Sequence, residues 1–218
     1  MGAFIGSQKF FKHPLVEVAK KYGYDEDNLF VLKGDLRSLE NFYPETYRNI
    51  ISCDYHSDNR KCLEYARDLV ASWLIEDSFL EVLNTNGLQA TLGGADRNRK
   101  ILANFKTTEE SDFIVSYNGC SRGLELMNDY TGYWARTGNL HLRDNKYPRL
   151  TTEHSLFLAV SIKRKEFALY DFNENIPATF IPSHPPFGGK PAYQLSITRN
   201  MMKEATPLKI TEAIKEHL

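Results

Sequence analysis

The sequence predicts a mixed α/β fold in which a small central sheet is flanked by helices. Three observations indicate this: a long helical pattern at residues 61–84, several short strand-like segments between residues 88 and 172, and a capped helical pattern at the C-terminus. The 218 residues suffice for one large domain. Hydrophobic residues make up 42% and charged residues 25%, which is typical of globular domains and excludes a disordered chain or a coiled coil.

The clearest helix covers residues 61–84, and Asn86-Gly87 is a stop signal after it. Glu76 shares the apolar stripe of this helix. A carboxylate that faces a core costs several kcal/mol unless it is paired or binds a cation. Two interpretations remain open: Glu76 is a functional inward carboxylate, or the helix is rotated and Glu76 lies at its edge. The apolar stripe at helical spacing consists of Leu69, Trp73, Leu80 and Leu83.

Alternating or continuous apolar segments predict the strands. Asn118-Gly119 predicts a tight hairpin between two of them. The almost wholly apolar segment 156–162 predicts a central strand. Residues 128–139 are expected to form a loop, and residues 177–194, with five prolines, a loop or an edge. Thr206 and Pro207 predict the start of the last helix. The expected strands are residues 88–94, 111–117, 123–127, 156–162 and 166–172.

The first sixty residues predict helical and loop material, with one helix beginning at Pro14. We therefore expect a helical elaboration at residues 1–60 and a core domain at residues 61–218. No signal peptide or membrane span is expected. Three cysteines without paired spacing fit a reducing compartment. A zinc site made of Cys53, His56 and Cys62 is conceivable, although solvated loop residues are the favoured interpretation.

Charge is unevenly distributed along a chain whose net charge is only -1. Residues 136–165 contain seven lysines and arginines against two acidic residues, and residues 97–106 hold a second basic cluster. The helical segment 62–84 is acidic. A basic face beside an acidic element is typical of a protein that binds phosphate next to a metal, although ordinary surface charge gives the same pattern.

Asp112 and Glu125 are the candidate catalytic pair. Asp112 lies six positions before Asn118, and Glu125 lies six after Gly119, so a two-residue hairpin places them opposite each other. Opposed carboxylates repel unless a cation lies between them. A divalent metal ion would resolve the repulsion, since Mg²⁺ is usually held by one or two carboxylates together with water and substrate phosphate.

Residues 62–172 resemble the PD-(D/E)xK superfamily of nucleases, whose fold is restriction-endonuclease-like. The matching segments are the Glu76 helix, SDFIV with Asp112, GLELM with Glu125, the basic segment LHLRDNKYPRL and the apolar strand LFLAVSI. Two positions depart from the family pattern. Ser111 stands where the family has proline, and Met127 stands where it has lysine. Lys146 is our candidate for the missing lysine, with Lys106 and Asn128 as further candidates.

The resemblance implies a restriction-endonuclease-like core and Mg²⁺-dependent hydrolysis of DNA phosphodiester bonds, with Mn²⁺ as a possible substitute. Asp112 and Glu125 would hold the metal, Glu76 a metal-bound water, and Lys146 would complete the catalytic set. The expected substrate is double-stranded DNA, and the leading hypothesis is a homodimeric type II restriction enzyme in the cytoplasm of a prokaryote or encoded by a phage. The expected phosphate contacts are Arg97, Arg99, Lys100, Arg143, Lys163 and Arg164.

Other functions stay open. A phage or mobile-element nuclease with structural specificity would have the same sequence features, and Met127 favours a catalytically degenerate DNA-binding or assembly protein. A small-molecule enzyme with a pocket at the aromatic segment 130–134 is a third hypothesis. Glu125 could simply form a surface salt bridge with Arg122 or Lys146. His141 and His184 are expected to be ordinary loop histidines.

Overall fold

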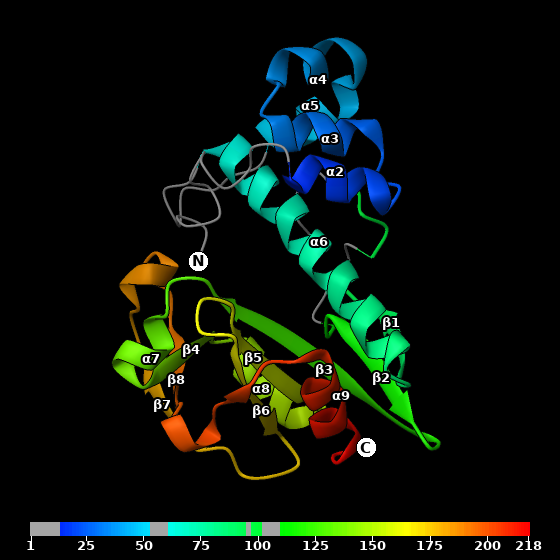
Figure 1. The fold of residues 1–218 in the computed structure, drawn as a ribbon. Helices are drawn as coiled ribbons and strands as arrows, with labels where there is room; N and C mark the ends of the chain where they lie inside the picture. The colour runs from blue at the N-terminus through cyan, green and yellow to red at the C-terminus, as the bar shows by residue number, and fades with distance from the viewer. Residues whose placement is uncertain (1–13, 53–60, 95–96, 102–109) are drawn as a thin grey trace. The chain divides into compact units, whose positions relative to one another are not determined.

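The computed structural model describes residues 14–52, 61–94, 97–101 and 110–218 (Figure 1). The chain divides into two compact units. The first comprises Met1–Ser78 with Ala95–Thr108, and the second comprises Phe79–Gly94 with Glu109–Leu218. The sequence-based boundary at residue 61 stays a prediction, because residues 53–60 lie outside the described part. No helix in the described part has both the length and the apolar character that a membrane crossing requires.

The described part of the first unit is helical. Gly34 ends α3 in the left-handed conformation, with φ of 74°, and the Asp35 carboxylate accepts a hydrogen bond of 3.0 Å from the Ser38 backbone N–H at the start of α4. The expected helix at Pro14 is confirmed. The helices are α2 (Pro14–Lys21), α3 (Glu26–Lys33), α4 (Leu36–Phe42), α5 (Pro44–Ile51) and α6 (Cys62–Thr85), which begins in this unit and ends in the second.

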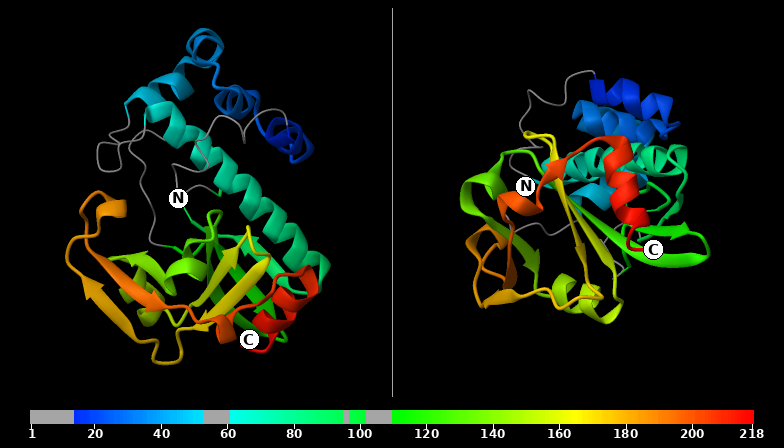
Figure 2. Two further views of the ribbon diagram at one scale, coloured as in Figure 1. Left: turned by 60° about the vertical axis from the view of Figure 1, so that its left-hand side comes forward. Right: turned by 60° about the horizontal axis from the view of Figure 1, so that its bottom comes forward.

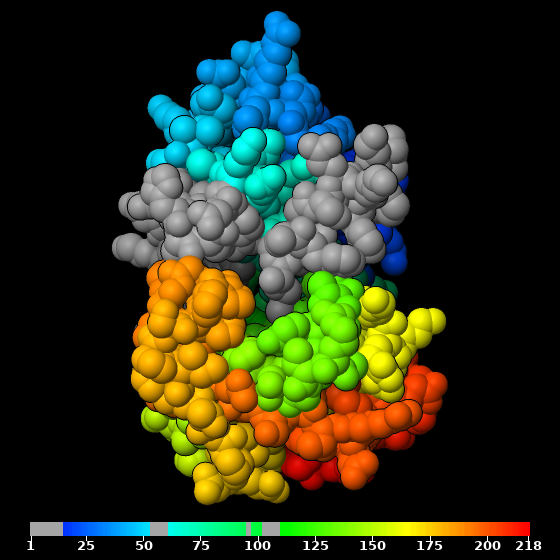
Figure 3. Space-filling view, turned by 90° about the vertical axis from the view of Figure 1, so that its left-hand side faces the viewer, coloured from blue at the N-terminus to red at the C-terminus, as the bar shows by residue number. Residues whose placement is uncertain are grey.

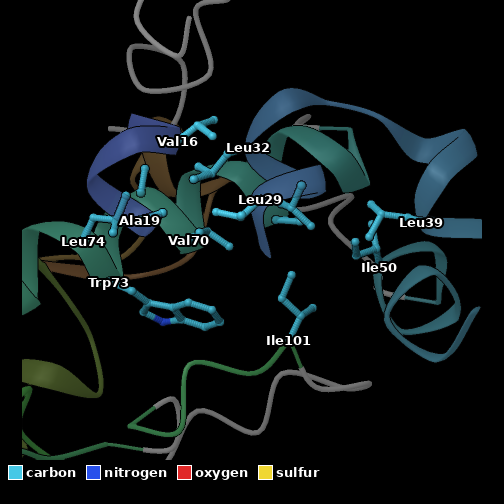
Figure 4. Close-up of a cluster of buried hydrophobic side chains, with 13 residues drawn as sticks. Val16, Ala19, Leu29, Leu32, Leu39, Ile50, Val70, Trp73, Leu74 and Ile101 are labelled. Atoms are coloured by element: carbon cyan, nitrogen blue, oxygen red, sulfur yellow. The ribbon is translucent and has the colours of Figure 1, made fainter. Parts of the chain in front are cut away.

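A hydrophobic core of its own holds the first unit together. The side chains converge from the helices and from the segment that contains Ile101 (Figure 4). Trp73 is completely buried in it. The predicted helix at residues 61–84 is therefore confirmed, but its buried stripe differs from the predicted one, since Leu69 and Leu80 are only half-buried. The buried α6 positions in this core are Ala66, Val70, Ala71, Trp73 and Leu74.

A six-stranded mixed sheet forms the centre of the second unit (Figures 1 and 2), with strand order β1-β2-β3-β5-β6-β9. All five predicted strands are present. The fold class is thus a mixed α/β fold with helices around a central sheet, as the sequence predicts. The strands are β1 (Gln89–Leu92), β2 (Phe113–Tyr117), β3 (Cys120–Asp129), β5 (Leu156–Ser161), β6 (Glu166–Asp171) and β9 (Lys203–Glu204).

The β2–β3 hairpin has the predicted turn and register. Asn118 and Gly119 both adopt positive φ, 50° and 84°, which is the requirement of a type I′ turn. Tyr117 pairs with Cys120 and Phe113 with Leu124. Asp112 directly precedes β2, so one further step of this register brings it opposite Glu125.

β5 is buried along its whole length and runs parallel to β3, with Glu125 paired to Phe157. A parallel neighbour needs a crossover connection. Here the crossover contains α7 (Tyr133–Thr137), β4 (Asn139–Arg143) and α8 (Lys146–Thr152). The order of α6, three antiparallel strands, a crossover helix and a parallel strand agrees with the predicted restriction-endonuclease-like core.

The expectation of a loop at residues 128–139 was wrong, and that of a loop or an edge at residues 177–194 is confirmed only for the edge strand at residues 178–181. Residues 128–139 contain α7, because the Asp129 carboxylate accepts hydrogen bonds from the backbone N–H groups of Thr131, Gly132 and Trp134 and so fixes the turn before the helix. Residues 177–194 contain strands because their prolines fall between strands and leave each ladder intact. β7 (Ala178–Ile181) and β8 (Ala192–Ser196) join β4 in a second sheet of order β4-β8-β7, which the sequence did not predict.

The two sheets of the second unit share a hydrophobic core. Leu140, Leu142 and Leu195 of the small sheet are completely buried, and Phe157 and Ala159 of the large sheet belong to the same cluster. Leu150 of α8 also lies in this core. The C-terminal helix α9 (Pro207–Lys215) lies beside β6, and the Thr206 hydroxyl accepts a hydrogen bond from the Lys209 backbone N–H, which confirms the predicted cap.

Candidate acidic site

The described part of the second unit brings Glu125 and Lys146 into direct contact. Only 1% of the Glu125 side chain is exposed, and the Lys146 ammonium donates to its Oε1 atom. Glu125 lies on β3 on the same side as Met127, which packs into the core that α8 covers. The side chain of Lys146, the first residue of α8, is therefore able to reach it. Sequence reasoning proposed Lys146 as the replacement for the lysine missing at Met127, and the structure places it against Glu125.

Arg149 is a second cation on Glu125 that the sequence reasoning missed. Its Nη2 atom donates to Glu125 Oε2 at 2.5 Å, and its Nη1 atom donates to Ser111 Oγ at 3.2 Å. Lys146 and Arg149 are three residues apart, so they project from one side of α8. This i, i+3 spacing in the segment LRDNKYPRL was a usable signal, but only the fold shows which carboxylate the two cations meet.

Asp112, the residue directly before β2, is the third member of the group. Its Oδ2 atom accepts a hydrogen bond of 2.8 Å from the backbone N–H of Leu126, the residue after Glu125. This bond continues the β2–β3 pairing through a side chain and fixes the carboxylate next to Glu125. Asp112 also interacts electrostatically with Lys146. Asp112, Glu125 and Lys146 are thus gathered at one end of the β2–β3 hairpin.

The electrostatics of this group favour the charged forms of Glu125 and Lys146. Burial alone would raise the pKa of Glu125, but Lys146 and Arg149 outweigh it and hold that pKa below its usual value. Burial alone would lower the pKa of Lys146, whereas the carboxylates of Glu125 and Asp112 raise it above its usual value. The repulsion expected between the two carboxylates is therefore already offset by two protein cations.

Close packing of small residues holds the strand that carries Asp112. A Cβ atom on Gly93 would lie 2.1 Å from the backbone oxygen of Ser111, and a Cβ atom on Gly123 would lie 2.6 Å from the Ser111 hydroxyl. Gly93 also donates a backbone hydrogen bond of 2.8 Å to the Asp112 oxygen. Gly93 has no room for a side chain because the Ser111 backbone occupies that space, whereas at Gly123 the serine side chains of residues 111 and 155 occupy it.

The donor set suits a hard divalent cation such as Mg²⁺. Asp112 and Glu125 supply the one or two carboxylates that such an ion commonly uses, with water as the remaining ligand. The Lys146 ammonium contacts Glu125 and interacts electrostatically with Asp112, which shows that a positive charge is accommodated there. Within residues 14–52, 61–94, 97–101 and 110–218, no group of three His, Cys, Asp or Glu side chains is arranged to hold a metal.

Glu76 belongs to the first unit, where it has a different partner. Its Oε2 atom accepts from Arg99 at 2.7 Å, and Arg99 also binds Asp77 at 2.6 Å. The interpretation of Glu76 as an edge residue of a rotated helix agrees with its half-buried position. Its predicted role beside a metal stays a prediction, and the site described above is composed of second-unit residues alone.

The residues predicted to contact phosphate differ in exposure and in whether a carboxylate already binds them. Only 12% of the Arg99 side chain is exposed, and two carboxylates engage it, so we do not retain it as a phosphate contact. Arg164 pairs with Glu166 at 2.9 Å on the surface. The remaining four are exposed and stay predictions: Arg97 and Lys100 in the first unit, and Arg143 and Lys163 in the second.

The other candidates for the missing lysine do not join the group. Asn128 lies on β3 an odd number of positions from Glu125, so its side chain points to the opposite face of the sheet. Lys106 lies outside the described residues, as do Cys53 and His56 of the conceivable zinc site. Arg122, once a possible partner of Glu125, instead pairs with Asp171.

Comparison with known proteins gives likenesses among solved structures. No protein-family model and no curated protein matches this chain. Among solved structures, the chain is similar to Hjc, a Holliday junction resolvase from the archaeal hyperthermophile Archaeoglobus fulgidus. The TM-score is 0.39 and the sequence identity 10%, over 66% of this chain and 98% of that one.

Proposed function

We propose that this protein is a metal-dependent endonuclease that hydrolyses phosphodiester bonds in double-stranded DNA. The observation that carries the proposal is that Asp112, just before β2, lies opposite Glu125 of β3, with the Lys146 ammonium in contact with Glu125 and under the electrostatic influence of Asp112. Two carboxylates and a lysine in one group are suited to chemistry on a phosphate, because they can combine a metal ion with a fixed positive charge.

Each residue of the group would have a distinct task. Asp112 and Glu125 would hold Mg²⁺ or Mn²⁺, which polarises a phosphate oxygen and lowers the pKa of water. Lys146 stays protonated and would stabilise the negative charge that develops on the phosphate during attack. Arg149 is only 9% exposed and would keep Glu125 fixed while Lys146 turns toward substrate. Arg143, Lys163 and Arg164 would contact the DNA backbone.

The finer form of the proposal is a homodimeric type II restriction enzyme. Discrete DNA fragments would support sequence specificity, whereas preferential cleavage of branched DNA would support a phage or mobile-element nuclease with structural specificity. Analytical ultracentrifugation of the protein with and without DNA tests the homodimer.

A catalytically degenerate DNA-binding protein is the second candidate, and one observation favours it. Both oxygens of Glu125 are already bound by protein cations, Lys146 and Arg149, so a metal ion must compete with them. Such a protein would bind DNA with a strong salt dependence and release it intact.

The test is cleavage of supercoiled and linear DNA in Mg²⁺, Mn²⁺ or EDTA by the wild type and by Asp112→Asn, Glu125→Gln and Lys146→Met. We expect Mg²⁺-dependent cleavage that falls about 100-fold or more in each variant. Asp144→Asn and Lys190→Met, which remove matched charges at exposed positions, should cleave normally. Intact DNA under all conditions with salt-dependent binding would establish the second candidate, and cleavage that survives Asp112→Asn would refute the assigned site.

A further inference from the structure

The outer face of the small sheet carries a row of polar side chains. The register places Thr179 of β7 beside Gln194 of β8, and Gln194 beside His141 of β4. Leu140, Leu142 and Leu195 point to the core, so their alternating neighbours His141 and Gln194 point away from it. His141 Nε2 and Gln194 Oε1 are 3.2 Å apart. This row belongs to the small sheet, whereas Glu125 belongs to the large sheet.

His184 reaches the same row from the segment between β7 and β8. Its ring centroid lies 4.2 Å from that of His141, and the Phe187 ring packs 4.7 Å from it. Three backbone hydrogen bonds fix the segment around it: His184 N–H donates to Lys190, and the His184 oxygen accepts from Phe187 and Gly189. His184 is therefore held at a defined place over His141 and is not an ordinary loop histidine. Figure 3 looks onto this side of the second unit, with the segment around η1 (Pro185–Phe187) in orange beside the green segment around α7.

The Nδ1 atom of His184 has no hydrogen-bond partner among the described residues, although only 7% of the residue is exposed. Leaving a buried polar atom unsatisfied costs about 1–3 kcal/mol. Most buried polar side-chain atoms in native proteins are paired, so this nitrogen has the capacity to bind an ion or a water molecule. The imidazole of His141 packs against this ring, and His141 in turn contacts the side-chain amide oxygen of Gln194.

We propose that His141, His184 and Gln194 bind one borderline divalent transition-metal ion, such as Zn²⁺ or Ni²⁺. Two ligands at about 2.1 Å from a tetrahedral ion lie about 3.4 Å from each other. The 3.2 Å between His141 Nε2 and Gln194 Oε1 is close to this value. The unpaired imidazole of His184 supplies the third ligand, and water the fourth.

The chemistry of the donors separates this site from the acidic one. Neutral imidazole favours Zn²⁺, Ni²⁺ and Cu²⁺, whereas Mg²⁺ favours oxygen ligands. The site proposed here should therefore not bind Mg²⁺. The proposal holds whether or not the protein is a nuclease. A bound ion would crosslink β4, β8 and the segment before η1, and so should stabilise the second unit.

Isothermal titration calorimetry of the untagged full-length protein with ZnCl₂ and NiCl₂ tests the proposal. We expect one equivalent of ion to bind, with MgCl₂ producing no competing heat. His141→Gln and His184→Gln should each weaken binding at least tenfold. A thermal melt followed by circular dichroism should show a higher Tm with Zn²⁺ for the wild type and a smaller rise for the His141→Gln variant.

Two controls distinguish this site from other binding. His154→Asn removes an exposed histidine elsewhere in the unit, and Asp112→Asn alters the acidic site, so both should bind Zn²⁺ as the wild type does. The half-buried His141 gives a variant that should fold even if the buried His184 variant does not. No saturable binding by the wild type, unchanged binding in His141→Gln, or loss of binding in Asp112→Asn would each overturn the proposal.

Discussion

Glu125 is a single residue on which both the fold and the acidic site depend, because its carboxylate is buried and its charge is neutralised by two cations. The side chain is 1% exposed and meets two cations from α8. A buried ion pair contributes modest net stability, but removal of one partner leaves an uncompensated charge. Glu125 should therefore affect stability as well as activity, whereas Lys146, which is 33% exposed, should affect mainly activity.

Replacement of Glu125 by alanine should destabilise the protein by about 3–5 kcal/mol, because Lys146 and Arg149 lose their shared partner in a buried environment. Urea denaturation at pH 7 measures the effect. Glu174→Ala, which removes an exposed carboxylate from the same unit, should change stability by less than about 0.5 kcal/mol. If Glu125→Ala lowered the free energy of unfolding as little as Glu174→Ala does, the buried ion pairs of Glu125 would be refuted.

Asp171 is a second residue whose charge stabilises the fold. Burial alone would raise its pKa, but hydrogen bonds from the Arg122 guanidinium, the Asn173 backbone and His217 lower that pKa to about 2. The Arg122 side chain also donates to the backbone oxygens of His154 and His217. One carboxylate thus connects β6, the start of β3 and the C-terminus.

The ion pair between Asp171 and Arg122 should make the free energy of unfolding decrease in acid. A carboxyl group whose pKa is lower in the folded state stabilises above its unfolded pKa and loses that contribution as pH falls through the folded pKa. Asp171→Asn should cost about 1–2 kcal/mol at pH 7, after allowance for solvent screening. The difference from wild type should vanish as pH falls from about 4 to about 2. Urea midpoints across this range measure it, and a difference that persists at low pH would contradict the assignment.

Among the elements, the β1–β2–β3 meander positions the acidic site. The type I′ turn at Asn118-Gly119 sets the register that brings Asp112 opposite Glu125. The close approach at Gly93 then fixes the backbone of residues 111–112 against the end of β1. The position of the Asp112 carboxylate thus depends on the turn at Asn118-Gly119 and on the backbone contacts at Gly93.

Replacement of Gly93 by alanine should both destabilise the protein and impair its activity. The added Cβ atom would lie 2.1 Å from the Ser111 backbone oxygen, so the strand entry must shift. We expect a loss of about 1–3 kcal/mol in urea denaturation, typical of overpacking. Any Mg²⁺-dependent cleavage should fall as well. Thr91→Ala, at an exposed position of the same strand, is the control. Wild-type stability in Gly93→Ala would contradict the close approach.

At the scale of the whole molecule, the chain has two compact units with separate hydrophobic cores. Each core contains one of the two tryptophans: Trp73 is fully buried in the first and Trp134 is 5% exposed in the second. Trp73→Phe and Trp134→Phe therefore give proteins whose fluorescence reports one unit at a time.

A core substitution in the first unit should affect mainly that unit. Leu32→Ala, at a fully buried position, should lower the stability reported by Trp73 by about 2–5 kcal/mol. The transition reported by Trp134 should shift less, because its core shares no residue with that of Leu32. Equal shifts in denaturant midpoint for both probes would show that the two units unfold as one cooperative block.

The sequence alone determined the local elements and one long-range pairing. Apolar patterns located α6 and five of the six strands of the large sheet, but not β9. Asn118-Gly119 fixed a register, because turn chemistry acts over neighbouring residues. This was sufficient to place Asp112 opposite Glu125. It was not sufficient for residues 177–194, where strand segments of only four and five residues between prolines carry too weak a pattern.

Only the tertiary structure decided which charges meet. Sequence predicted a metal between Asp112 and Glu125, whereas the fold shows Lys146 and Arg149 of α8 beside Glu125 and Arg99 beside Glu76. It also brought His184 over His141, from segments more than forty residues apart. The physical reason is that a salt bridge or a ligand set depends on distances of a few ångströms in space, which spacing along the chain does not encode beyond a single helix or hairpin.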